Sequence, residues 1–330
     1  MKEELERVAF NWSLSPLKEV KLLTVSENAT FKAEYEDGVS IILRVNRAFY
    51  HTLKELCSEF DWVNAITTSD CNIKSPKVIT THDGEYLVPI KIEAEGETFE
   101  LHVVAFEFCK GSEPKVGKDL IAWFEKLGKI TAEMHKHTLA WKRPEGFVRK
   151  VWNFDTMVGV DGYWGNWRTA PALAGSDEAV ITDALDIVKY RLESYNNDER
   201  YGLVHADLRL SNLLISGDDM IVIDYDDCGF CWYMYDFAAA ISFYELDENV
   251  PELQEAWLKG YTSIREVAQA DVDEMQTFIL LRRVLLLAWL TTHSDTPTAE
   301  EFTEGFAEGT RFMAEQYIQT HNQKIYDYAV

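Results

Sequence analysis

The stretch that decides the fold is LVHADLRLSNLLISGDDMIVIDYDDCGFCWYMYDFAAA, residues 203–240. It places Asp207 two residues after His205 and five before Asn212, and a later apolar run ends in Asp224. A carboxylate beside a hydroxyl group can accept its proton, while an amide oxygen and a second carboxylate can together hold a divalent cation. Mg²⁺ prefers such a combination of few protein oxygens with substrate phosphate oxygens. The spacing therefore predicts a loop for metal-assisted chemistry on a phosphate group.

Patterns on either side of this loop predict strands first and helices later. Short runs rich in β-branched and apolar residues, with Asp-Gly turns, precede residue 110, and helical periodicity dominates afterwards. This order predicts an α+β fold with two lobes, a small β-rich lobe at 1–109 and a larger, mostly helical lobe at 110–330. The expected strands are 20–25, 31–35, 40–45, 77–80, 85–89, 100–108, 203–204, 213–216 and 220–223, with 77–80 and 85–89 forming a hairpin, and the expected helices are 51–66, 118–137, 177–195 and three within 251–323.

Composition excludes several classes of function. The 330 residues carry a formal net charge of -24, so the surface repels nucleic-acid backbones and anionic lipid headgroups, and we expect no nucleic-acid and no membrane partner. The most apolar run, 278–290, is interrupted by Arg282 and Arg283 and is too short for a bilayer. Five scattered cysteines and no signal-peptide core in residues 1–12 favour a cytoplasmic protein. We expect Cys228 and Cys231 to be ordinary buried thiols.

At the residues of the 203–240 stretch, the sequence resembles the aminoglycoside phosphotransferase and choline kinase superfamily. Within it, the bacterial stress response kinases and type II homoserine-kinase-like proteins are the most similar branches. The resemblance implies a bilobal protein-kinase-like fold that uses ATP and Mg²⁺. It also implies site roles: Asp207 as catalytic base with His205 in the same loop, Asn212 and Asp224 as magnesium ligands, and Asp236 as a carboxylate that braces the loop. Asp226 is either a further metal ligand or a solvated turn residue.

The first lobe supplies candidates for nucleotide binding. Kinases place a phosphate-covering loop where this chain has the turn 26–30, and Ser26, Asn28 and Thr30 are its candidate residues around Glu27, although a plain hairpin turn has the same pattern. Arg44 stands where the family has a strand lysine, and Glu59 is its expected helix partner; Arg47 is the substitute. Backbone groups of Glu107 and Cys109 occupy the expected hinge, where they would contact adenine. His135 is expected to be a core histidine.

The acceptor is the least determined part of the reaction. Aromatic residues could form cation–π walls for an amine, or they could be ordinary core residues; they are Tyr163, Trp164, Trp167, Trp232 and Trp257. The acidic charge favours a cationic acceptor. The leading hypothesis is an ATP-dependent kinase that phosphorylates the hydroxyl group of a small molecule such as an amino alcohol, an aminoglycoside or a homoserine-like compound. The alternatives are a Ser/Thr protein kinase of the stress-response type and a nucleotide-binding pseudokinase. Acceptor identity and oligomeric state are left open.

Overall fold

The computed structural model describes residues 1–330 apart from Glu27, Glu95, Val116, Lys118, Ala172, Asn196 and 328–330, with side chains up to His321. The chain divides into two compact units. The first comprises Met1–Ser112, Trp141–Arg149 and Leu214–Asp226, and the second comprises Glu113–Ala140, Lys150–Leu213 and Asp227–Val330. Two later segments therefore pack with the N-terminal part. The boundary between functional lobes at residues 109 and 110 stays a prediction.

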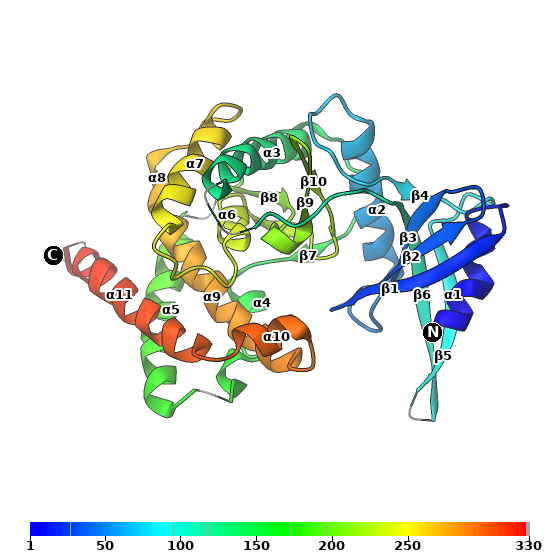
Figure 1. The fold of residues 1–330 in the computed structure, drawn as a ribbon. Coiled ribbons are helices and arrows are strands. Elements are labelled where there is room, and N and C mark those ends of the chain that lie inside the picture. The colour runs from blue at the N-terminus through cyan, green and yellow to red at the C-terminus, as the bar shows by residue number, and fades with distance from the viewer. Residues whose placement is uncertain are drawn as a thin grey trace. The chain divides into compact units, whose positions relative to one another are not determined.

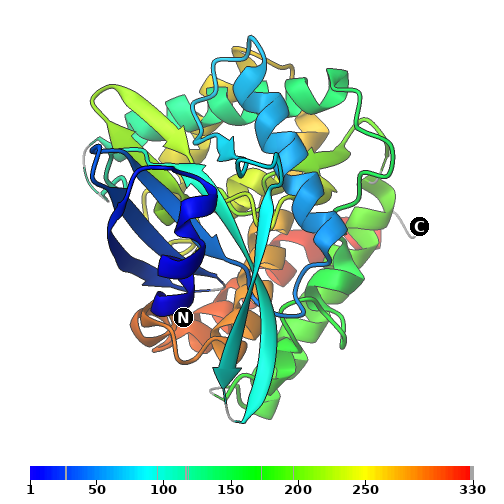
Figure 2. The same ribbon diagram turned by 90° about the vertical axis from the view of Figure 1, so that its right-hand side faces the viewer.

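An antiparallel sheet forms the body of the first unit (Figures 1 and 2). Its order is β1-β2-β3-β6-β4, with β5 also paired to β6. Buried residues alternate with half-buried ones along β2 and at the start of β3, which places Phe31 and Leu43 in the core, where helix α1 contributes Leu5 and Val8. The strands are β1 (Leu17–Val25), β2 (Ala29–Tyr35), β3 (Ser40–Val45), β4 (Val78–Ile79), β5 (Leu87–Ala94) and β6 (Glu97–Glu107), and α1 is Lys2–Val8.

The expected hairpin of 77–80 with 85–89 is wrong. A turn does form there, since the amide of Thr81 donates to the carbonyl of Glu85 at 2.8 Å, but β4 and β5 each pair with β6. The physical reason is the length of β6, because one edge of its 11 residues accommodates β5 and then β4. The hairpin is instead formed by β5 and β6, with Ala94 opposite Glu97 and Gly96 at a φ of 82° between them.

Helix α2 (Leu53–Thr68) follows β3 and corresponds to the helix expected at 51–66. Thr52 begins it with a capping box, in which its hydroxyl accepts from the amide of Glu55 and the Glu55 carboxylate accepts from the amide of Thr52. The apolar residues at spacings of three and four, among them Leu56 and Phe60, are buried. Glu59 lies on the same buried face, which places a carboxylate inside the first unit.

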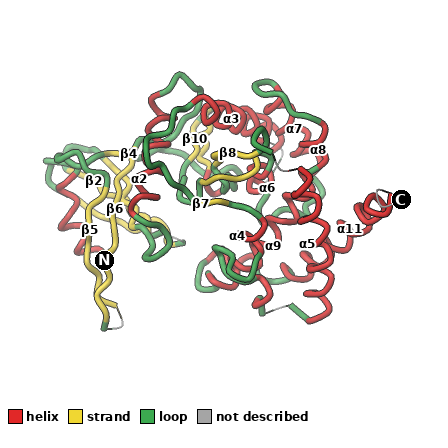
Figure 3. The backbone as a smooth tube through the Cα atoms, turned by 180° about the vertical axis from the view of Figure 1, so that it is seen from behind, coloured by secondary structure: helices red, strands yellow, loops and turns green. Residues whose placement is uncertain are grey.

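The second unit is mostly helical (Figure 3). Its small sheet has the order β7-β11-β8 and leads into the loop after β8. The region 251–323 contains the three long helices expected there and two short ones. The long helices are α3 (Leu120–Ala140), α5 (Gly175–Tyr195), α7 (Val250–Thr262), α9 (Met275–Thr292) and α11 (Phe306–Asp327); the short ones are α4 (Phe154–Val158), α6 (Tyr235–Ala240), α8 (Gln269–Asp273) and α10 (Pro297–Phe302); the strands are β7 (Lys150–Val151), β8 (Tyr201–Val204) and β11 (Gly229–Trp232). A separate two-stranded sheet of β9 (Leu213–Ser216) and β10 (Asp219–Val222) belongs to the first unit from Leu214 onward.

Helices α3 and α7 lie side by side in the second unit (Figure 1). Glycines make this approach possible: a Cβ on Gly128 would lie 2.0 Å from the carbonyl oxygen of Trp257, and one on Gly260 would lie 1.9 Å from that of Glu125. The stretch Gln269–Thr292, which includes α9, is long and apolar enough to cross a membrane, but 83% of its apolar window is buried inside the protein. Helix α9 therefore has the surroundings of a core helix.

Candidate functional site

The loop between β8 and β9 is held by a carboxylate from α6. The Asp236 carboxylate accepts hydrogen bonds from the backbone amides of Ala206, at 2.8 Å, and His205, at 3.4 Å. Ala206 has a φ of 65°, a backbone conformation that costs energy for a residue with a Cβ and therefore needs such support. The bracing role implied for Asp236 is what these two hydrogen bonds provide. They fix the backbone immediately before Asp207.

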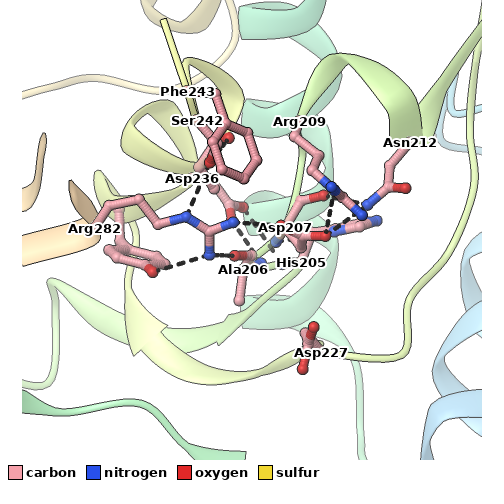
Figure 4. Close-up of polar contacts among 12 residues, drawn as sticks. His205, Ala206, Asp207, Arg209, Asn212, Asp227, Asp236, Ser242, Phe243 and Arg282 are labelled. Carbon is pink, nitrogen blue, oxygen red and sulfur yellow. Dashed lines mark hydrogen bonds and ion pairs between the residues drawn. The ribbon is translucent and has the colours of Figure 1, made fainter. Parts of the chain in front are cut away.

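Asp207 is buried and has a partner on each carboxylate oxygen (Figure 4). Its Oδ1 lies 2.5 Å from Nη2 of Arg282, and its Oδ2 lies 2.7 Å from Nδ2 of Asn212 and 3.2 Å from Nε of Arg209. Burial by itself would raise the pKa of Asp207, but the positive charges of Arg209 and Arg282 outweigh it and hold that pKa below its ordinary value. The loop therefore presents an oriented, ionised carboxylate at neutral pH.

Asn212 has an amide orientation that suits a cation ligand. Its nitrogen donates both to the backbone oxygen of Asp207, at 2.8 Å, and to Oδ2 of the same residue. The amide oxygen therefore points away from Asp207 (Figure 4), which leaves it as the atom that would face a cation. Asp224, in the first unit, follows β10 with a φ of 60° and a side chain that is 35% exposed. Oxygen donors at both positions fit Mg²⁺, and their joint use remains a prediction.

The expected pair of Arg44 and Glu59 is confirmed, and it is buried. The two terminal guanidinium nitrogens of Arg44 each donate a hydrogen bond to one carboxylate oxygen of Glu59, both at 2.8 Å. Nη1 of Arg44 also lies 3.6 Å from Asp224, and Nη2 lies 3.7 Å from Asp226. Burial opposes the charge of Arg44, but the three carboxylates outweigh it and raise the arginine's pKa. Arg44 faces these carboxylates, so Arg47 is not needed to take over its predicted role. Contact between Arg44 and phosphate stays a prediction.

Asp226 is not a solvated turn residue. Its carboxylate is 5% exposed and lies 3.4 Å from Nε2 of His51, beside Arg44. Burial by itself would raise the pKa of Asp226. His51 and the positive charges of Arg44 and Arg149 lower it by more than burial raises it, so the pKa of Asp226 lies well below its ordinary value. A metal role for Asp226 stays a prediction, in competition with these partners. Sequence reasoning missed His51, because 175 residues separate it from Asp226.

The candidate nucleotide-binding residues lie at two places in the first unit, the turn between β1 and β2 and the end of β6. In the turn 26–30, Glu27 lies outside the described residues, and the side chain of Asn28 is buried and accepts the amide of Arg47 at 3.0 Å. The side-chain amide of Asn28 therefore supports the turn. Thr30 lies opposite Arg44 where β2 pairs with β3. At the end of β6, the amide of Glu107 donates to the carbonyl of Lys77 at 3.0 Å. An adenine contact would therefore need a different donor, such as the backbone of Cys109.

The histidine and aromatic expectations have mixed outcomes. His135 is a core histidine, since its ring lies 2.9 Å from Asp236 and 2.8 Å from the hydroxyl of Tyr261, and burial lowers its pKa. It supports the same Asp236 that braces the loop. For four of the five aromatic candidates the core alternative holds, since Trp164, Trp167, Trp232 and Trp257 are buried, whereas Tyr163 is substantially exposed.

A cavity of about 360 Å³ opens in the second unit beside the loop that carries Asp207. Leu210, three residues after Asp207, forms part of its wall together with apolar residues of α3. Tyr244 and Asp247 add polar groups. Burial raises the pKa of Tyr244, and the negative charges of Glu113 and Glu301 raise it further. No motif in the sequence indicates this cavity, because its lining comes from segments far apart in the chain.

Comparisons with known proteins agree with this geometry. Residues 20–270 match the phosphotransferase enzyme family. The chain is similar to the structure of a microcompartment-associated aminopropanol kinase, with 38% identity, a TM-score of 0.86 and coverage of 96% of this chain and 97% of that one. It also resembles amicoumacin kinase of Bacillus subtilis (strain 168), 21% identical over 304 residues, which cover 89% of this chain and 86% of that protein. The structure of amicoumacin kinase hAmiN in complex with AMP-PNP, Ca²⁺ and Ami is 22% identical, with a TM-score of 0.73 and coverage of 93% and 92%. The predicted kinase-like α+β fold is confirmed.

Proposed function

Because the chain belongs to the phosphotransferase enzyme family, we propose that it transfers the γ-phosphoryl group of ATP to the hydroxyl group of a small amino alcohol. The observation that carries this proposal is Asp207, a buried and ionised carboxylate on a braced loop, beside an asparagine whose amide oxygen is left for a cation. The similarity to an aminopropanol kinase over nearly the whole chain supports the choice of acceptor. The net charge of -24 is compatible with a cationic acceptor.

The reaction needs little from the protein beyond positioning and charge stabilisation. We assign to Asp207 the task of orienting the acceptor hydroxyl and taking its proton as the new oxygen–phosphorus bond forms and the bond to the ADP oxygen breaks. His205 and Asp236 hold the loop that carries this carboxylate. The products are a phosphate monoester and ADP, and the proton leaves through Asp207.

The remaining site residues serve the nucleotide in this proposal. Asn212 and Asp224 would hold Mg²⁺, which, when bound, neutralises charge on the β- and γ-phosphates. Arg44 would bind phosphate oxygens while Glu59 holds its guanidinium in place. The backbone of Ser26, Asn28 and Thr30 would cover the phosphates, and the hinge at Glu107 and Cys109 would contact adenine. We place the reaction in the cytoplasm.

The cavity beside Leu210 is our candidate for the acceptor. Its apolar side, from Leu120, Ile121 and Phe124, would contact the carbon chain, and Asp247 with Tyr244 would face the ammonium group. A short amino alcohol combines these two requirements with a hydroxyl group. The hydroxyl would then approach the loop that carries Asp207.

The test is ADP release with ATP and Mg²⁺ across matched acceptors. Aminopropanol is compared with propanol, which lacks the amine, and with propylamine, which lacks the hydroxyl. We expect turnover with the amino alcohol, much weaker turnover with the alcohol, and none with the amine. Turnover only with a generic protein substrate would support the Ser/Thr protein kinase alternative, and nucleotide binding without any turnover would support the pseudokinase.

A further inference from the structure

Two consecutive arginines in the apolar helix α9 are buried, and burial of an arginine is costly unless its charge is paired. Arg283 pairs with Glu245 at 2.6 Å and donates to the hydroxyl of Thr310 at 3.1 Å. Arg282 points to a different neighbour, because successive residues of a helix project about 100° apart. Its neighbour is the catalytic loop, where it meets Asp207.

The guanidinium of Arg282 is held on every side (Figure 4). Its Nε donates to the hydroxyl of Ser242 at 2.9 Å, and its Nη1 donates to the hydroxyl of Tyr235 at 3.2 Å and to the carbonyl of Ala206 at 3.4 Å. The ring of Trp164 lies 4.9 Å from it. With its orientation fixed in this way, Nη2 reaches Oδ1 of Asp207 at 2.5 Å. The side chain is 2% exposed, so water screens this ion pair very little.

We propose that Arg282 is a positioning residue for phosphoryl transfer, which fixes the orientation of the Asp207 carboxylate. This inference rests on the proposed function, in which Asp207 takes the proton. Asn212 and Arg209 hold Oδ2 of Asp207, whereas Arg282, from α9, holds Oδ1. Arg282 therefore fixes the side of the carboxylate that the other two residues do not contact. Arg282 also binds the carbonyl of Ala206, which joins α9 to the backbone of the loop.

The contacts around Asp207 define what loss of Arg282 would do. The groups that face its carboxylate are Arg209, Arg282, His205 and the neutral Asn212. Without Arg282, Oδ1 loses its partner at 2.5 Å, while Oδ2 keeps Asn212 and Arg209. The carboxylate is then held on one oxygen only, so its orientation toward the acceptor hydroxyl is less well fixed.

The experiment compares Arg282→Gln with Arg283→Gln. Arg283 is the matched control, because it is the next residue of α9, is also buried and ion-paired, and binds Glu245 rather than Asp207. For Arg282→Gln we expect kcat to fall about 10²-fold, because the base is misplaced, with nearly unchanged ATP affinity. The loss should fall on kcat rather than on the KM for ATP, because Arg282 acts through the base. Arg283→Gln should lose stability and keep a kcat close to that of the wild type.

A wild-type kcat in Arg282→Gln, or the same loss of kcat in Arg283→Gln, would overturn the proposal. If Arg282→Gln does not fold, Arg282→Lys takes its place. That variant keeps the charge and loses the planar fork, so we expect kcat to be reduced about 10-fold or more with a nearly unchanged KM for ATP. A wild-type kcat in Arg282→Lys would contradict the positioning role.

A double-mutant cycle separates this inference from the proposed function. Near-normal turnover in Asp207→Asn would overturn the base assignment itself. If Asp207→Asn is impaired as expected, adding Arg282→Gln should reduce the residual turnover little further, because Arg282 acts through Asp207. A second fall of the full size seen in the single variant would show that Arg282 acts elsewhere.

Discussion

Replacing Glu59 with Gln should destabilise the first unit by about 2–3 kcal/mol. The wild-type carboxylate makes two charge-assisted hydrogen bonds to Arg44, both 2.8 Å, and such bonds contribute about 1.5–3 kcal/mol each. Gln keeps one acceptor oxygen, so one bond and the charge are lost. Breaking a fully buried ion pair costs about 3–5 kcal/mol. Asp224 and Asp226, at 3.6 and 3.7 Å, still compensate Arg44, so the loss stays below that range.

Urea denaturation at neutral pH measures this loss through the midpoint and slope of the transition. The control is Asp219→Asn, which breaks the exposed pair of Lys74 and Asp219 in the same unit. Exposed pairs contribute about 0–1 kcal/mol, so the control should change the midpoint little. A Glu59→Gln variant that is no less stable than the control would refute the reasoning. It would mean that the buried charge of Arg44 does not need the Glu59 carboxylate to compensate it.

Further predictions concern the catalytic base, the nucleotide and pH. Asp207→Asn should lower turnover about 10²–10⁴-fold while calorimetry still detects ATP binding with Mg²⁺; normal turnover would contradict the base role. Arg44→Ala should raise the KM for ATP more than the KM for the acceptor, and equal ATP affinity would exclude a phosphate contact. ATP should raise the melting temperature with Mg²⁺ but much less with EDTA, and equal shifts would exclude the metal. The lowered pKa of Asp226 stabilises the fold above the unfolded value of about 3.9, and this contribution is lost as pH falls. Asp226→Asn should therefore be less stable than wild type at pH 7 in urea, with a smaller difference near pH 3; a constant difference would contradict the shift.

Local features of the site were predictable from the sequence. The loop residues His205, Asp207 and Asn212 lie within eight positions, so their spacing alone predicts that they lie close together, as their contacts show. Arg44 and Glu59 lie on a strand and the next helix, and their pairing follows from that order and from opposite charge. Such short-range patterns carry the information because the backbone geometry between the residues is nearly fixed by the element type.

Contacts between distant segments were not predictable in the same way. The sequence shows that Arg282 interrupts an apolar run, which indicates a buried charge, but its partner Asp207 is 75 residues away. The partner of β5 was misassigned for a similar reason, since Asp83-Gly84 indicates a turn but does not say which strand the following residues join. The sequence left each tryptophan as either an acceptor wall or a core residue, because a hydrophobic ring gives no sign of which side it faces, and the structure places them in the core.

Phosphorus NMR of the reaction mixture is the direct measurement of the proposed chemistry. The protein is incubated with ATP, Mg²⁺ and the proposed amino alcohol, in parallel with Asp207→Asn. We expect a phosphate monoester signal that grows in equal amount with ADP for the wild type, and a rate about 10²–10⁴-fold lower for the variant. ADP with inorganic phosphate and no monoester, or equal rates for the two proteins, would contradict phosphoryl transfer to the acceptor hydroxyl through Asp207.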